Sequence, residues 1–272
     1  MPDKFKALWV SHSSINDFLT CPRLYYLNNI YKNPETGRKI SITNPHLSLG
    51  SAVHDVLESL SELPAEKRFD IPLKILFEAK WRKVTGKLGG FQDEIEEMRF
   101  KDRGLTMLSR VESNPGPLLE RAVKIKQDLP WYWLSEEKNI ILCGKIDWIK
   151  YNATDDTVEI IDFKTGKNDE AENSLQLSIY RLLLEHCQKR QVKKASYWYL
   201  DKGELIDFEL PASKESYSKV MKVALKMKTA RKNNDFACEK HGCYACEAME
   251  KIVSGQAEFV GVGGYNKEVY IV

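Results

Sequence analysis

The sequence predicts an α/β protein built as one elaborated domain, residues 1–272. Apolar residues recur at helical spacing through much of the first half, whereas alternating apolar and polar residues, typical of strands, begin at Trp131. A chain of 272 residues with 43% hydrophobic residues is also long enough to bury a substantial core. Helices and strands therefore both contribute to the expected core.

The first half of the chain is expected to be mainly helical. Ile15, Phe18 and Leu19 predict a short helix that runs into Cys21-Pro22. A second helix is expected at about 49–63, and residues 64–128 are charged helix formers with several Gly and Pro breaks, which indicates a helical insertion. The apolar stripe expected on the second helix consists of Leu49, Val53, Val56, Leu57 and Leu60.

Strands and one more amphipathic helix are expected in the second half. Residues 140–150 form one β-run and residues 158–163 the next, and the polar turn at 152–156 predicts that the two form a hairpin. A helix is predicted at about 175–188, followed by strands at 192–200 and 205–210.

The most informative stretch is 160–166, which reads as the end of a buried strand that breaks into a glycine turn. Because side chains alternate along a strand, Asp162 and Lys164 should lie on one face, and Ile161 and Phe163 on the other. A carboxylate and an ammonium at one strand end suit a metal ligand beside a cation that orients water or phosphate.

Other polar residues are expected to join this stretch. If the hairpin brings Asp147 beside Asp162, the two carboxylates form a site suited to Mg²⁺ or Mn²⁺, and the imidazole of His54 would favour manganese. Gln176 and Tyr180 are four residues apart in the predicted helix, so both could reach the same pocket.

Three of the six cysteines crowd together in the segment 236–250. Cys238, Cys243 and Cys246 have the spacing C-x4-C-x2-C, and in a reducing compartment such crowding indicates a metal rather than disulfides. Zinc is one possibility, with His241 or Cys21 as the fourth ligand.

The overall charge demands no polyanionic partner, since 41 basic and 39 acidic residues give a net charge of +2. Local charge is more informative, because the predicted helix 214–232 carries seven basic residues and one acid, which predicts contact with phosphates. No apolar run approaches the length of a membrane span, so a cytoplasmic protein without membrane contact is expected.

The order of these motifs resembles the PD-(D/E)XK nuclease superfamily, and specifically its RecB-like branch, which includes the AddB nuclease domain and the CRISPR-associated adaptation exonucleases. The resemblance rests on His54, then Gly144-x-x-Asp147, then Asp162-x-Lys164, then Gln176-x-x-x-Tyr180. It implies a restriction-endonuclease-like core, in which helices flank a central mixed sheet and the helical insertion follows the first core helix.

The resemblance also implies roles for individual residues. The metal ligands would be His54, Asp147, Asp162 and the carbonyl of Phe163. Lys164 would orient the attacking water, while Gln176 and Tyr180 would position the lysine or the nucleic-acid backbone. Glu136 and Glu137 are possible equivalents of an additional strand glutamate in the family, a role left open here.

Iron–sulfur members of this branch have one cysteine near the N-terminus in a Cys-Pro context and three near the C-terminus. The resemblance therefore implies a 4Fe-4S cluster on Cys21, Cys238, Cys243 and Cys246, with Zn²⁺ as the alternative. The implied function is a metal-dependent DNA exonuclease on single strands or DNA ends in repair, recombination or phage DNA processing, with a possible helicase or integrase-like partner. The alternatives are a non-cleaving nucleic-acid-binding subunit and a structure- or sequence-specific endonuclease.

Overall fold

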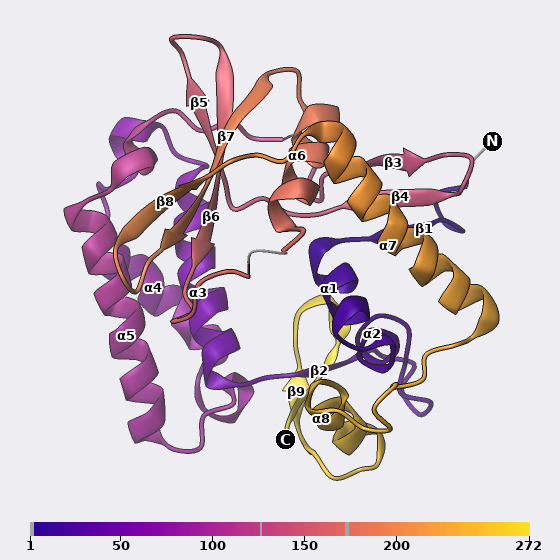
Figure 1. The fold of residues 1–272 in the computed structure, drawn as a ribbon. Coiled ribbons are helices and arrows are strands. Elements are labelled where there is room, and N and C mark those ends of the chain that lie inside the picture. The colour runs from indigo at the N-terminus through magenta and orange to yellow at the C-terminus, as the bar shows by residue number, and fades with distance from the viewer. Residues whose placement is uncertain (1–2, 126, 172–173) are drawn as a thin grey trace. The chain divides into compact units, whose positions relative to one another are not determined.

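The computed structural model describes residues 3–125, 127–171 and 174–272 (Figure 1). The chain forms two compact units, each assembled from separate stretches of sequence. Unit 1 comprises Met1–Asn44, Trp133–Leu142 and Ser218–Val272, and unit 2 comprises Pro45–Tyr132 and Cys143–Tyr217. The organisation of the chain as a single nuclease domain stays a prediction.

Unit 2 is built on a mixed four-stranded sheet in the order β5-β6-β7-β8. Its strands are β5 (Trp148–Asn152), β6 (Thr157–Lys164), β7 (Gln191–Tyr199) and β8 (Glu204–Phe208). β5 and β6 form the expected antiparallel hairpin, and β7 runs parallel to β6. Parallel neighbours need a crossover, which α6 (Gln176–Cys187) provides. Strand β6 lies in the interior of this sheet, and six of its eight residues are buried.

Helices α3 (Pro45–Leu60), α4 (Leu73–Trp81) and α5 (Glu94–Ser113) lie next to one another beside this sheet (Figure 1). All five residues of the expected stripe on α3 are buried, and they share a core with Phe163 and Trp198 of the sheet. Gly104 allows α5 to pack closely, because a Cβ there would lie 2.5 Å from the ring of Phe77. The insertion is helical, as expected, with short 3-10 turns at Ala65–Lys67, Arg82–Val84, Gly86–Gly89 and Gly116–Leu119.

The expected continuous strand 140–150 is wrong. The structure has β4 (Ile140–Cys143) and β5 as strands of two different sheets, and Asp147 lies in the bend between them. The carboxylate of Asp147 accepts a hydrogen bond of 2.9 Å from the backbone N–H of Phe163, in place of a carbonyl from a paired strand. The pairing of β5 with β6 ends at Trp148 and Ile161, next to this side-chain hydrogen bond.

Unit 1 contains short strands and helices. One sheet, most of which belongs to unit 1, has the order β1-β4-β3. Its strand β1 (Leu8–Val10) runs parallel to β4, and β3 spans Trp131–Ser135. Glu136 and Glu137 lie in the turn after β3, not in a strand. The other sheet has the order β2-β10-β9, from β2 (Ile40–Ile42), β9 (Glu258–Val262) and β10 (Glu268–Ile271), with one more 3-10 turn at Gly264–Asn266.

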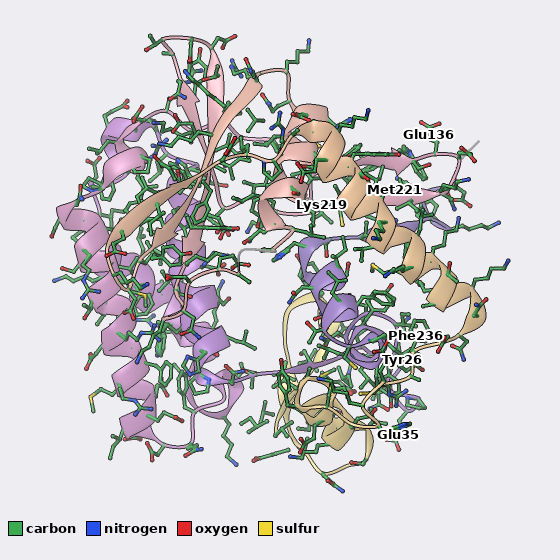
Figure 2. The ribbon with its side chains drawn as sticks, in the orientation of Figure 1. Tyr26, Glu35, Glu136, Lys219, Met221 and Phe236 are labelled. Atoms are coloured by element: carbon green, nitrogen blue, oxygen red, sulfur yellow. The ribbon has the colours of Figure 1, made fainter. Side chains whose placement is uncertain are left out.

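Unit 1 contains four helices in the part of the chain that the structure describes: α1 (His12–Thr20), α2 (Pro22–Asn29), α8 (Tyr244–Val253) and most of α7 (Ser213–Asn233). Two of them, α2 and α8, contribute Leu27, Met249 and Ile252 to a buried cluster with Ile40. Tyr26 of α2 and Phe236 after α7 lie side by side, with ring centroids 5.2 Å apart (Figure 2). Pro22 begins α2 because proline is tolerated at the first helical position.

The fold class is confirmed as mixed α/β with mixed sheets flanked by helices. Across the ranges that the structure describes, every helix is too short or too polar to cross a lipid bilayer.

Candidate active site and metal centre

The end of β6 places Asp162 and Lys164 on the same face of the sheet, as the alternation predicts. Lys164 Nζ lies 2.9 Å from Asp162 Oδ2, while the ring of Phe163 packs into the core on the opposite face. Asp162 is only 2% exposed. A carboxylate this deeply buried needs several partners, and most of them come from α6.

The first two turns of α6 supply an amide and a hydroxyl to the same carboxylate. Gln176 Nε2 donates to Asp162 Oδ1 at 2.8 Å, and Gln176 Oε1 accepts from Lys164 Nζ at 2.6 Å. The hydroxyl of Tyr180 lies 3.2 Å from Asp162 Oδ1, one helical turn after Gln176. The two polar side chains on one face of this helix therefore do meet at the end of β6.

Asp147 and His54 lie at the same site. His54 Nδ1 of α3 is 3.3 Å from Asp147 Oδ2, and the His54 ring packs edge-on against Phe163, with centroids 6.0 Å apart. The backbone N–H of Phe163 holds the Asp147 carboxylate in place. The structure thus brings together the six side chains that the sequence assigns to the nuclease site: His54, Asp147, Asp162, Lys164, Gln176 and Tyr180.

Burial and mutual repulsion set the charge of this site. Burial raises the pKa of Asp162 to about 7, and the negative charge of Asp147 adds to the rise, against the opposing effect of Lys164. Burial lowers the pKa of His54, but the hydrogen bond and charge of Asp147 outweigh burial, so the net pKa is raised. Two acids whose charges repel each other form a site that a divalent cation would stabilise.

Three charged residues at the site were not identified from the sequence. Glu170 lies in the loop after β6 and pairs with Lys164 at 2.8 Å. Glu58 is one turn after His54 on α3, and it forms an ion pair with Lys145. Carboxylate or imidazole atoms of His54, Glu58 and Asp147 lie within 4.8 Å of one another. The four-residue spacing of His54 and Glu58 was a signal for this placement; Glu170 has no comparable local signal.

The helical insertion holds the turn that follows β6. Arg103 of α5 donates to the carbonyl oxygen of Thr165 at 2.9 Å and pairs with Asp201 at 3.0 Å. Since Thr165 directly follows Lys164, this bridge fixes the backbone where the strand ends.

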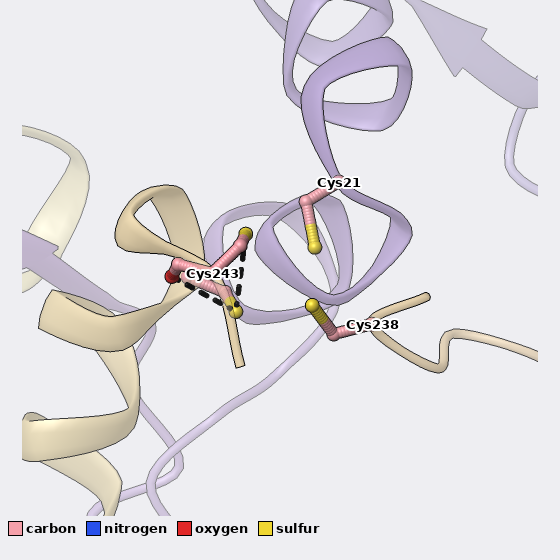
Figure 3. Close-up of side chains that lie close together, drawn as sticks. Cys21, Cys238 and Cys243 are labelled. Carbon is pink, nitrogen blue, oxygen red and sulfur yellow. Dashed lines mark hydrogen bonds between the residues drawn. The ribbon is translucent and has the colours of Figure 1, made fainter. Parts of the chain in front are cut away.

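Unit 1 contains a second cluster of metal-binding side chains. The sulfur atoms of Cys21, Cys238, Cys243 and Cys246 lie within 4.8 Å of one another. Figure 3 shows the thiols pointing toward a common centre, with the sulfur atoms of Cys243 and Cys246 3.6 Å apart. The fourth member is Cys21, at the junction of α1 and α2, and not His241.

Backbone donors favour thiolates at this cluster. Hydrogen bonds from the backbone N–H groups of Gly242 and Lys240 lower the pKa of Cys238 to about 6. Burial raises the pKa of Cys246 to about 12. Four converging sulfurs, two of them on the surface side with lowered pKa values, fit a thiolate-bound metal or cluster.

Comparison with known proteins identifies the superfamily of the chain. The family model of the PD-(D/E)XK nuclease superfamily matches residues 9–254, so the chain belongs to this superfamily. Membership implies a metal-dependent nuclease that acts on nucleic acid. No curated protein matches the chain.

Proposed function

We propose that the chain is a RecB-like DNA exonuclease, related to the AddB nuclease domain and the CRISPR-associated adaptation exonucleases, that degrades single strands or DNA ends. The observation that carries this proposal is that His54 pairs with Asp147, Asp147 binds the backbone N–H of Phe163, and Asp162 pairs with Lys164, all at the end of β6. The biological setting would be repair, recombination or phage DNA processing, with a helicase or integrase-like partner.

The proposed metal ligands are His54, Asp147, Asp162 and the carbonyl of Phe163. A divalent metal bound there, Mg²⁺ or Mn²⁺, would lower the pKa of the attacking water and neutralise charge that develops on the phosphate. Lys164 is held by Asp162, Glu170 and Gln176, so its ammonium is fixed where it could orient that water. Gln176 and Tyr180 keep the Asp162 carboxylate in one orientation.

A cleaving enzyme is favoured over a non-cleaving binding subunit. Asp162 contacts Lys164 and Gln176 directly, and Asp147 binds the backbone N–H of Phe163, the residue next to Asp162. Asp162 is only 2% exposed and lies near a second acid, Asp147, and the repulsion between the two carboxylates destabilises the folded state. A protein that only binds nucleic acid would gain nothing from this arrangement, whereas a metal-dependent nuclease needs it to bind its metal.

The proposal is tested by digestion of end-labelled linear, circular and single-stranded DNA with Mg²⁺ or Mn²⁺, beside the Asp162→Ala variant. An exonuclease releases mononucleotides or short products from labelled ends and leaves circular DNA intact. Cleavage of circles at internal positions would instead support the endonuclease alternative. Binding without cleavage of any substrate would support the non-cleaving subunit.

For the cysteines of unit 1 we propose a 4Fe-4S cluster, with zinc as the alternative. The one-plus-three arrangement of cysteines along the chain supports the cluster. The sulfur separation of Cys243 and Cys246 supports zinc, because Zn–S bonds of about 2.3 Å in a tetrahedron give sulfurs about 3.8 Å apart. Absorbance near 400 nm after anaerobic purification, together with iron and zinc analysis, decides between the two.

The basic helix α7 is proposed to contact the nucleic-acid backbone. Within unit 1 its exposed residues include Lys219, Lys222, Lys226 and Lys232 (Lys219 is marked in Figure 2). Phosphate contacts release counterions, so binding should weaken steeply as salt is raised. DNA affinity that does not respond to ionic strength would exclude this role.

A further inference from the structure

A cavity of about 540 Å³ opens in unit 2 beside Asp147. Glu58 of α3 and Lys145 of the bend before β5 both line it, and the two side chains form an ion pair. Lys145 precedes Asp147 by two residues in the same bend, so one short stretch of backbone positions both. Neither Glu58 nor Lys145 has a role in the mechanism described above.

The two lysines near the carboxylates differ in exposure. The side chain of Lys164 is 17% exposed and is held by Asp162, Glu170 and Gln176. The side chain of Lys145 is 62% exposed, although its ion-pair partner Glu58 is only 17% exposed. The carboxylate is therefore the fixed member of the pair, and the ammonium is its solvent-facing member. Of these two cations, Lys145 is the one that a substrate can reach.

The net charge of the site determines whether a phosphate can approach it. The carboxylates of Glu58, Asp147, Asp162 and Glu170, when ionised, carry four negative charges, and the ammonium groups of Lys145 and Lys164 carry two positive charges. One divalent metal ion would cancel the net charge of −2 that these six groups carry. A bound divalent metal would reduce the repulsion of a phosphate at this cavity, which Asp55, Glu62 and Asp128 also line, beside Lys80 and Lys124. The exposed ammonium of Lys145 would then be available as a phosphate ligand.

We propose that Glu58 and Lys145 form a substrate-positioning pair, in which Glu58 holds the ammonium of Lys145 against a backbone phosphate of the strand that occupies this cavity. The inference rests on the proposed nuclease function and adds a phosphate subsite next to the scissile bond. Lys145 neutralises the phosphate, and Glu58 acts through Lys145 without binding the metal.

The first test is a salt titration of single-stranded DNA binding, with Ca²⁺ replacing Mg²⁺ or Mn²⁺. Loss of one phosphate contact should reduce the slope of log affinity against log salt by about 0.7 in Lys145→Ala, whereas Lys145→Arg should keep the wild-type slope. The matched control is Lys193→Ala, since Lys193 is 60% exposed and also ion-paired, with Asp155, away from this cavity. An unchanged slope in Lys145→Ala, or an equal drop in Lys193→Ala, would overturn the proposal.

The second test uses steady-state cleavage. Lys145→Ala should raise KM about five- to tenfold with a smaller change in kcat, because one phosphate contact is lost while the metal-binding residues are intact. Glu58→Gln should raise KM by less than Lys145→Ala does, with little change in kcat, and should leave unchanged the Mn²⁺ concentration that gives half-maximal rate. Its control Asp155→Asn should leave KM, kcat and that Mn²⁺ concentration at their wild-type values. A several-fold higher Mn²⁺ requirement in Glu58→Gln would make Glu58 a metal ligand and overturn the positioning role.

These two tests separate failure of the inference from failure of the proposed function. If the wild-type protein cleaves no DNA, the nuclease proposal fails, yet the salt slope still reports whether Lys145 binds a phosphate. If the wild type cleaves and the Lys145→Ala slope is unchanged, the nuclease stands and the subsite is wrong.

Discussion

Gln176 and Lys164 are joined by a hydrogen bond of 2.6 Å between the amide oxygen and the ammonium group, and the nitrogen of the same amide donates to Asp162 at 2.8 Å. One side chain from α6 thus fixes both the cation and the carboxylate that end β6. The amide can do this because it has a donor and an acceptor in one plane. In the proposed mechanism, this bridge sets the distance between the metal ligand and the residue that orients water.

Removal of the bridge should slow cleavage. We expect Gln176→Ala to reduce kcat/KM by about 10- to 100-fold, since partners that orient a metal ligand typically contribute this much. The exposed Gln191 of β7 provides the control, and Gln191→Ala should cleave at the wild-type rate. A Gln176→Ala variant with wild-type cleavage would show that the bridge has no part in catalysis.

Tyr180 makes a weaker contribution to the same carboxylate. Tyr180→Phe removes one buried hydroxyl 3.2 Å from Asp162 Oδ1, and a hydrogen bond of about 1 kcal/mol corresponds to a decrease of about fivefold in kcat. Tyr151→Phe removes a hydroxyl that binds Asp156 at the exposed hairpin turn, so its activity should be unchanged. Equal activities of the two variants would argue against a positioning role for Tyr180.

The cysteine centre should contribute to the stability of unit 1. Cys238→Ser should lose the bound metal, and the midpoint of thermal unfolding should fall, because a centre that joins Cys21 to Cys238 closes a long loop, a constraint on the unfolded chain of about 5 kcal/mol. Cys187→Ser changes a cysteine outside the cluster and should keep both metal content and midpoint. Metal analysis and calorimetry of the two variants check this. Full metal content in Cys238→Ser would contradict a four-cysteine centre.

Glu268 of β10 should make the stability of unit 1 depend on pH. Burial raises its pKa, but hydrogen bonds from Thr36, Asn33 and Tyr270 outweigh burial and hold the net pKa below 4.5. A carboxyl group whose pKa is lower in the folded state stabilises the protein above the unfolded-state pKa, and this contribution is lost as the pH falls through the folded-state pKa.

The corresponding variant is Glu268→Gln. At pH 7 it should be less stable than wild type by about 1.5–3 kcal/mol, the usual value of hydrogen bonds to a charged group. The difference in free energy of unfolding should shrink as the pH is lowered below about 4.5, where the wild-type carboxyl also becomes neutral. A difference that is constant from pH 7 to pH 3 would contradict this account of Glu268.

The parts of the site that local periodicity determines could be predicted from the sequence. Asp162 and Lys164 share a face because strands alternate, and Gln176 and Tyr180 share a face because helices repeat every 3.6 residues. Contacts between distant segments could not be predicted in this way. The bridge from Arg103 to Thr165 and the pair of Lys145 with Glu58 depend on how helices pack against the sheet, which no local pattern encodes.

The errors also have physical causes. Residues 140–150 alternate like one strand, but the side chain of Asp147 replaces a backbone acceptor and ends the pairing. The strands β1, β2 and β10 are only three or four residues long, and each depends on a partner far away in the sequence. Such short strands have too few residues to show a period of two.

The central claim is that Asp162 is a metal ligand of a nuclease, and the most direct measurement is Mn²⁺-dependent cleavage of end-labelled single-stranded DNA by Asp162→Asn, with DNA binding measured in parallel. The account predicts that cleavage falls by at least about 1,000-fold, a loss of about 4 kcal/mol of transition-state stabilisation, while DNA binding is retained. The exposed Asp169 provides the isosteric control, and Asp169→Asn should cleave like wild type. Wild-type cleavage by Asp162→Asn would contradict the account.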